Sequence, residues 1–370
     1  MTTEAPAIRT VPAIVAAGDS RAAKAINGES KVFLEIEGLA LVAHVVLVLQ
    51  DVPEIDSVWV VGNRERLAKV FDDRRVRERL TKPLYVIAQL ESLLANAWEG
   101  YRCVLSGHPE EGRDPETEAD RDTEVLYLSG DLPFATPQEI SAFIQMSRAN
   151  GANYTCGLTT EEALSSFSSD HMGGDGIDVA YFNLRDGRFR QNNLHYAQPA
   201  RIGVLQAVEE MYERRYQQKF WNMLGFAWTV MTAKGGGLRV VFFYSIMHLS
   251  GLFDRHGWRR LSDAFRIVTI RMNEEAVGAM MQTRFRFAAP PVGGAGIDID
   301  TEEEYAAARK YFRRWRAEQT AFAAETYGPP GLPARLDGAT PTALADGSAP
   351  HAAGIEGGAR RDGGAGGDQV

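Results

Sequence analysis

The fold of this chain is decided by residues 125–137, which read VLYLSGDLPFATP. An apolar β-type run ends in Gly-Asp and turns into a helix start, where Thr136 is the N-cap and a proline follows it. A strand that leads into a capped helix in this way is typical of α/β proteins. The same turn places Asp131 at the carboxyl end of the strand, which is the edge where ligands of parallel sheets bind.

On both sides of this stretch, short apolar runs alternate with helical patterns. Strands are predicted at residues 12–17, 57–62, 83–88 and 124–129, and helices at residues 39–49, 64–80 and 92–99. Strands that are apolar throughout and alternate with helices indicate a parallel sheet covered on both faces. From about residue 203 to 282 the pattern is helical, which predicts a helical insertion within the α/β domain.

Composition excludes some classes of partner. The 370 residues carry 40 Lys+Arg against 49 Asp+Glu, a formal net charge of −9, and no block of the chain is rich in Lys and Arg. A nucleic-acid partner is therefore not expected. Cys103 and Cys156 have neither metal-site nor disulfide-framework spacing, so both are interpreted as reduced thiols.

The N-terminal sequence and one long apolar stretch bear on where in the cell the protein is expected. The N-terminus is a poor signal peptide, so a cytoplasmic protein is expected. The apolar stretch 220–253 is split near Lys234 and Arg239 into runs of roughly fourteen residues, short of the ~20 that span a bilayer. It is interpreted as buried or interfacial helices. Packing in the core or at a homodimer interface is the simplest explanation for their apolar residues.

Two segments are expected to lie outside the core. Residues 328–370 are rich in Gly, Ala and Pro and have no aromatic side chain, which predicts a disordered tail after a domain spanning residues 1–327. The acidic stretch 108–124 is predicted to be a solvated loop.

A small-residue turn follows the first predicted strand. It consists of Ala16, Ala17, Gly18, Asp19, Ser20 and Arg21, with Lys31 ten residues after Arg21. Backbone N–H groups in such a turn can approach phosphates, and the two cations can neutralise them. A tight turn with solvated cations is an equal alternative. The spacing matches neither a P-loop nor a dinucleotide fingerprint.

Carboxylates follow strands at two places. Asp131 can ligate Mg²⁺ or merely cap its turn. Residues 296–305 read GIDIDTEEEY; on a short strand Asp298 and Asp300 would share a side, because side chains repeat every two residues. Either can be a second metal ligand or part of the cap of the helix that follows.

Together and in this order, these segments resemble the MobA-like nucleotidyltransferases, a GT-A-type superfamily that includes molybdenum cofactor guanylyltransferase and sugar-phosphate and polyol-phosphate nucleotidylyltransferases. The family motifs read LAAGxGxR with a later PK, then GDxP, then DIDTPEDL. This chain has AAGDSR with SKVFL, SGDLPFATPQEI and IDIDTEEEY, spread over about residues 11–315. The first motif departs most: one glycine is missing, Asp19 stands in the turn, and Ser precedes Lys31.

The resemblance implies a fold and an activity. The fold would be a three-layer α/β/α Rossmann-like domain with a mostly parallel mixed sheet and a helical insertion. The activity would be transfer of a nucleotidyl group from an NTP to a phosphorylated small-molecule acceptor, with release of pyrophosphate and dependence on Mg²⁺, an enzyme of the EC 2.7.7 type. The nucleotide and the acceptor stay open, the latter among molybdopterin and sugar, polyol and small-alcohol phosphates.

The resemblance also implies roles for individual residues. Nucleotide contacts would come from the backbone of residues 16–20, from Gly130 and from Gln89; Arg21 and Lys31 would bind phosphates. Asp131 would ligate the metal with Asp300, and Asp298 is a further candidate. Arg190 and Asn193 are acceptor-site candidates, against the alternative of a surface turn, and His195 is interpreted as structural.

Two rival functions remain at this point. The degenerate first motif would suit a nucleotide-binding or regulatory protein on the same fold that has lost transfer activity, since fold does not fix function. The apolar insertion would suit an enzyme that acts on a lipid precursor at a membrane surface, although burial explains the same residues more cheaply.

Overall fold

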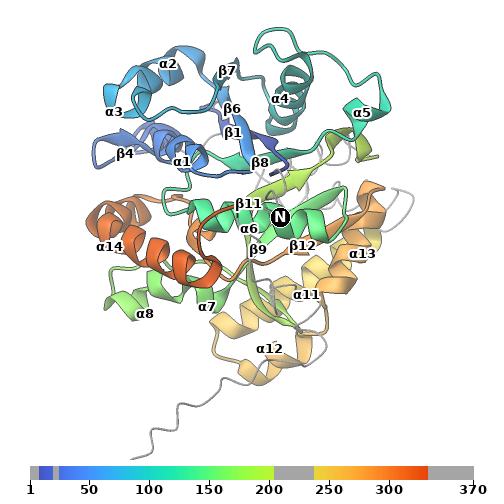
Figure 1. Cartoon of the computed structure of the whole chain (residues 1–370). Helices are drawn as coiled ribbons and strands as arrows, with labels where there is room; N and C mark the ends of the chain where they lie inside the picture. The colour runs from blue at the N-terminus through green and yellow to red at the C-terminus, as the bar shows by residue number, and fades with distance from the viewer. Residues whose placement is uncertain (1–7, 20–24, 204–236, 332–370) are drawn as a thin grey trace, which may run out of the picture.

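The computed structural model describes residues 8–19, 25–203 and 237–331 (Figure 1). Ser20, Arg21, the first part of the insertion and the predicted tail from residue 332 onward lie outside the described residues. The strands are β1 (Val11–Ala17), β2 (Ala25–Ile26), β3 (Glu29–Ser30), β4 (Glu35–Ile36), β5 (Leu39–Ala40), β6 (Ile55–Gly62), β7 (Leu84–Ala88), β8 (Val125–Ser129), β9 (Tyr154–Thr160), β10 (Phe182–Leu184), β11 (Gly187–Ala197) and β12 (Phe285–Ala288). The helices are α1 (Leu41–Gln50), α2 (Arg64–Asp72), α3 (Arg74–Arg77), α4 (Leu93–Ser106), α5 (Glu118–Arg121), α6 (Pro137–Ala149), α7 (Glu161–Leu164), α8 (Ser169–Met172), α11 (Gly237–Arg255), α12 (Arg259–Phe265), α13 (Ile270–Met281) and α14 (Glu302–Tyr327), with 3-10 turns η1 (Lys31–Phe33), η2 (Ser165–Phe167), η3 (Pro199–Arg201) and η4 (Gly294–Gly296).

The main sheet is mixed and mostly parallel. Its strand order is β12-β9-β11-β8-β1-β6-β7, and β10 pairs with β11. Strands β1, β6, β7 and β8 run parallel, whereas β11 is antiparallel to both β8 and β9. The chain proceeds from β1 outward to β6 and β7 and then places β8 on the other side of β1. The loops after β1 and β8 therefore border a topological switch point, where α/β sheets bind their ligands.

Helices cover both faces of this sheet, as expected for a three-layer α/β/α domain. Helices α1, α2 and α6 pack against one face, which presents side chains such as Val15 and Leu128. Helix α4 packs against the other face, beside Tyr127. Tyr127, His195 and Cys156 are register partners across β8, β11 and β9, so they share this second face. Helix α13 contacts Cys156 there, and the insertion thus extends the layer that contains α4.

The strand predictions are confirmed to within two residues, but several helix predictions are wrong in extent. The helix predicted at 64–80 is interrupted because the Asp73 side chain accepts from the Arg75 N–H and starts a new helix. The helix predicted at 92–99 continues to Ser106 and ends at Gly107, whose φ of 72° is left-handed. The helix predicted from residue 39 begins at Leu41, because residues 39 and 40 pair as β5.

The acidic stretch 108–124 is more ordered than predicted. Asp120 is buried in it and accepts hydrogen bonds from the Arg113 guanidinium and from the Thr117 N–H, which closes the short helix α5. These hydrogen bonds, led by the one from Arg113, hold the pKa of Asp120 well below its usual range. The prediction of a solvated loop is therefore wrong at this aspartate, whose charge is neutralised inside the protein.

From residue 237 onward, the described part of the insertion consists of helices α11, α12 and α13 joined by short turns. Helices α11, α12 and α13 gather at one end of the molecule, away from α2 and α4 (Figure 1). The helical pattern is interrupted between α11 and α12 at Gly257, which has a φ of 74°. Among the described residues, no helix combines the length and the apolar character that crossing a bilayer requires.

Candidate active site

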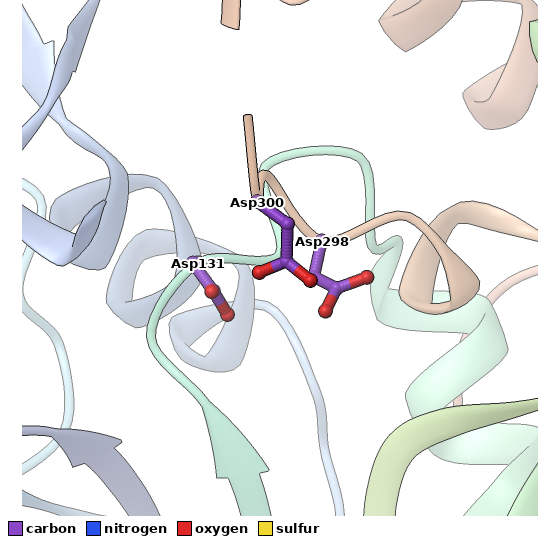
Figure 2. Close-up of side chains that lie close together, drawn as sticks. All are labelled: Asp131, Asp298 and Asp300. Atoms are coloured by element: carbon purple, nitrogen blue, oxygen red, sulfur yellow. The ribbon is translucent and has the colours of Figure 1, made fainter. Parts of the chain in front are cut away.

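Three carboxylates meet at the switch point. Asp131 follows β8, and Asp298 and Asp300 lie in the segment between η4 and α14. One oxygen from each lies within 4.8 Å of those of the other two, and Figure 2 shows the side chains lying close together although they come from distant parts of the sequence. Asp131 is only 2% exposed. The structure thus brings together the aspartates that the sequence separates by more than half the domain.

The segment that carries Asp298 and Asp300 is not a strand, so that expectation is wrong. Residues 297–300 form extended chain without strand pairing. The alternation survives nonetheless, because Ile297 and Ile299 are buried in a cluster with Phe134 while both aspartates remain partly exposed. An extended backbone gives the predicted two-residue repeat without a hydrogen-bonded neighbour.

Close backbone packing fixes the start of this segment. A Cβ added to Gly294 would lie 2.0 Å from the Phe134 carbonyl oxygen, and one added to Gly293 would lie 2.4 Å from that of Ala163. The Ala295 N–H donates to both carboxyl oxygens of Glu139, at 3.2 and 3.0 Å, and Glu139 is fully buried. The chain that leads to the acid cluster is therefore positioned by glycines and by one buried carboxyl group.

Lys31 lies between two of the aspartates. It begins the turn η1, and its Nζ is 2.9 Å from Asp131 Oδ2 and 2.5 Å from Asp300 Oδ1. Burial by itself would lower the pKa of Lys31, but the two carboxylates outweigh that effect and raise this pKa well above its ordinary value. The ammonium therefore stays charged at any physiological pH.

The acceptor candidates lie on β11, at the same edge. Arg190 Nη2 donates to Asp298 Oδ1 and forms an ion pair with it. Burial raises the pKa of Asp298, an effect that Arg190 opposes. Asn193 precedes Leu194, which is the register partner of Leu128 near the carboxyl end of β8. Arg190 thus borders the acid cluster directly, and Asn193 lies on the strand beside it.

His195 has the surroundings of a structural residue. Its Nδ1 lies 3.0 Å from the Tyr154 hydroxyl, and burial lowers its pKa to about 4. A neutral imidazole held in the sheet layer in this way has no charge to offer a phosphate.

The first loop holds its unusual aspartate through hydrogen bonds to Gln89. Residues Ala16 and Ala17 end β1, and Gly18 follows. The Asp19 N–H donates to Gln89 Oε1 at 2.9 Å, and Gln89 Nε2 donates back to Asp19 Oδ1 at 2.7 Å. Gln89 therefore braces the loop through both ends of its amide. Its contact with a nucleotide base stays a prediction.

Arg66 is the functional candidate that sequence reasoning missed. It lies in the first turn of α2 and pairs with Asp19 at 3.3 Å and with Glu29 at 2.6 Å. Its guanidinium carbon also lies 3.8 Å from the centre of the Phe33 ring. No motif marks this residue, but it follows the parallel strand β6, and that position places it at the ligand edge.

Gly130 allows the carboxyl ends of β1 and β8 to lie close together. Its N–H donates to the Ala16 carbonyl at 2.8 Å, and an added Cβ would lie 3.1 Å from that oxygen. A side chain there would push β8 away from β1. Gly130 therefore sets the spacing between the first loop and Asp131.

The donor set fits a hard divalent cation. The three carboxylates offer oxygen atoms close to one another in a partly buried place, which is the chemistry that Mg²⁺ selects. Two cations, Lys31 and Arg190, border the same cluster. Such a site can hold a metal and phosphates side by side.

Two known enzymes are similar in sequence to a part of this chain. Residues align at 23% identity over 145 positions with the 2-C-methyl-D-erythritol 4-phosphate cytidylyltransferase of Chlorobium luteolum, covering 39% of this chain and 57% of that protein. The enzyme of the same name from Prosthecochloris aestuarii aligns at 27% identity over 146 positions, covering 39% and 56%. This chain therefore spans just over half the length of these relatives.

A solved structure and a family model complete the comparison. A hypothetical transferase from Thermus thermophilus superposes with a TM-score of 0.48 and 17% identity, over 80% of this chain and 99% of that one. The model of the MobA-like NTP transferase domain matches residues 12–221, more than half of the chain. This protein therefore belongs to the MobA-like NTP transferase domain family.

Proposed function

We propose that this protein is a nucleotidyltransferase that transfers an NMP group from an NTP to a phosphorylated small molecule and releases pyrophosphate. The observation that carries the proposal is Lys31 held between Asp131 and Asp300 at the switch point of the sheet. We place the catalytic unit within residues 1–327 and regard the insertion, about 203–282, as part of it.

The reaction needs little covalent chemistry from the protein. An oxygen of the acceptor phosphate attacks the α-phosphorus in line and forms a new P–O bond. The bond to the β-phosphate oxygen breaks, and pyrophosphate leaves with its electron pair. The attacking oxygen already carries negative charge, so no strong general base is required. Orientation and neutralisation of charge account for most of the rate in such transfers.

Each described residue then has a physical task. The backbone of residues 16–19 and Gly130 shape the space beside the phosphates, and Lys31 neutralises phosphate oxygens. Arg190 holds Asp298 and borders the acceptor side together with Asn193. Asp131, Asp298 and Asp300 would hold Mg²⁺, which when bound offsets the negative charge shared by the two phosphate groups.

The relatives suggest the first substrates to test. Their names describe cytidylyl transfer to a phosphorylated polyol. We therefore propose CTP as the nucleotide and a sugar or polyol phosphate as the acceptor. A regulatory protein on this fold would bind the nucleotide without releasing pyrophosphate.

A pyrophosphate-release assay with CTP, GTP, ATP and UTP, Mg²⁺ and a panel of acceptor phosphates tests the proposal. Asp131→Asn is expected to lower turnover at least a hundredfold, which corresponds to about 2.7 kcal/mol of transition-state stabilisation. The matched control is Asp170→Asn, at an exposed aspartate in α8. If Asp131→Asn keeps most of its activity, or if nucleotide binds without any release, the transferase assignment is wrong.

A further inference from the structure

Helix α11 carries apolar side chains both on the side that packs into the domain and on a second side that is exposed. Its inner side packs Phe243, Ile246 and Met247 into a core cluster that includes Phe189 of β11. Its outer side presents Leu238, Phe242, Leu249 and Leu252, which are 59%, 55%, 41% and 49% exposed. These four follow one another at intervals of four, seven and three residues, so they lie along one helical stripe.

The neighbouring helix, which packs against α11 through the Ser250–Ser262 hydrogen bond, is also flanked by exposed apolar side chains. Around α12, Trp258 is 57% exposed, Leu261 46% and Ile267 51%. We call these three side chains and the four on α11 the outer face. Burial in the core, which is the simplest explanation that the sequence offers for these apolar residues, accounts only for the inner side of α11. Seven exposed apolar side chains on two helices that pack together are typical of a binding surface for a partner or a membrane.

The described charge around the outer face is opposite in sign to that of the protein. Among the described side chains of residues 238–267, three are arginines, Arg239, Arg260 and Arg266, and one is acidic, Asp263, whereas the whole chain has a net charge of −9. Arg239 and Arg260 have exposed side chains among the apolar residues. An apolar stripe flanked by arginines and by Trp258 has the composition of helices that lie in the interface of an anionic membrane.

The same charge disfavours a second copy as the occupant. A twofold contact would place the outer face of one copy on the outer face of the other. It would bring two sets of excess arginines together, and like charges across an interface oppose association. Anionic lipid supplies the complementary charge and also accepts the apolar side chains.

We propose that the outer face of α11 and α12 docks this protein on an anionic lipid surface, with Phe242, Leu249 and Trp258 entering the boundary between headgroups and acyl chains. No helix among those described can span the bilayer. In the proposed arrangement the outer face rests on one leaflet. This inference does not depend on the proposed transfer reaction, because its readout is binding.

Vesicle flotation with the full chain tests the proposal. We expect the protein to float with vesicles that contain phosphatidylglycerol at about one lipid in three, to stay behind with vesicles of phosphatidylcholine alone, and to be released by salt. The double variant Phe242→Ser/Leu249→Ser should reduce the bound fraction about tenfold, since it removes two of the apolar anchors. The matched control is Phe322→Ser, at a side chain of α14 that is 42% exposed.

A charge variant keeps the test decisive if the apolar variant folds poorly. Arg239→Gln/Arg260→Gln leaves the apolar side chains in place and is expected to weaken flotation and its dependence on salt. Failure of the wild-type chain to float with anionic vesicles would overturn the proposal. So would a dimer in light scattering that Phe242→Ser/Leu249→Ser dissociates, which would assign the outer face to a second copy. A large fall in melting temperature for that double variant would show that the chain itself covers the face.

Discussion

The buried carboxyl group of Glu139 is expected to make the stability of the whole domain depend on pH. Glu139 is fully buried on α6, and its carboxyl group accepts hydrogen bonds from the backbone N–H groups of Thr136 and of Ala295, the second of which leads into the acid cluster. Burial raises the pKa of Glu139 to about 8, against an ordinary value of 4.5. Between these two values the folded protein binds a proton that the unfolded chain has released.

The sign and size of the effect follow from this difference. Stability conferred by the protonated carboxyl is fully present below about pH 4.5 and is lost as the pH rises toward 8, at up to about 1.4 kcal/mol per pH unit. The loss is roughly 3 to 5 kcal/mol in total. Glu139→Gln keeps an oxygen that accepts from the Ala295 N–H but carries no charge. The variant should therefore gain stability relative to the wild type by that amount in alkaline solution.

Urea unfolding followed by circular dichroism across this pH range measures the effect. The difference in unfolding free energy between Glu139→Gln and the wild type should grow steadily with pH. Glu303→Gln removes the same charge from an exposed position in the first turn of α14 and should leave the slope unchanged. If the profiles of Glu139→Gln and the wild type run parallel, the carboxyl is not held protonated and the reasoning is wrong.

Two further outcomes are expected from the packing and charge around the site. Gly294→Ala should lower the unfolding free energy by about 1 to 3 kcal/mol, because the added Cβ would lie 2.0 Å from a carbonyl oxygen. Gly251→Ala in α11, where the added Cβ would lie 3.9 Å from the Asn183 side chain, should be neutral or slightly stabilising in the same urea titration. Arg66→Gln should weaken NTP binding about tenfold in calorimetry, because it leaves Asp19 uncompensated beside the phosphates. Adding Asp19→Asn should restore much of that affinity, and a double variant no better than Arg66→Gln would argue against charge as the cause.

The sheet could be predicted because its signals are local. Strands β1, β6, β7 and β8 are apolar runs bounded by polar turns, and Thr136 and Thr301 cap their helices within four residues. The break at Asp73 also has a local cause, a capping aspartate, but it lies inside an otherwise helical pattern and was therefore overlooked. The pairing of β11 between β8 and β9 is a long-range property that no local pattern specifies.

In the candidate site, too, the residues that belong to local motifs could be predicted, whereas those placed by long-range packing could not. Asp131, Asp298, Asp300 and Lys31 belong to short motifs whose order in the chain suggested that they meet, and the structure places them together. Arg66 belongs to no motif, and its position depends on how α2 follows β6. The exposure of the outer face could not be predicted from the sequence either. A helix with apolar residues on all sides is typical of a buried helix, and only the elements packed around it decide which side is exposed.

The charges gathered at the switch point explain why a divalent cation belongs in the proposed reaction. Three carboxylates face Lys31 and Arg190, and Arg66 faces both Asp19 and Glu29. Each group therefore has one more negative than positive charge, in a place where burial strengthens electrostatic interactions. An NTP would be repelled by such a site. A doubly charged cation among the aspartates would reverse the sign of their group and would turn an arrangement that repels phosphates into one that attracts them.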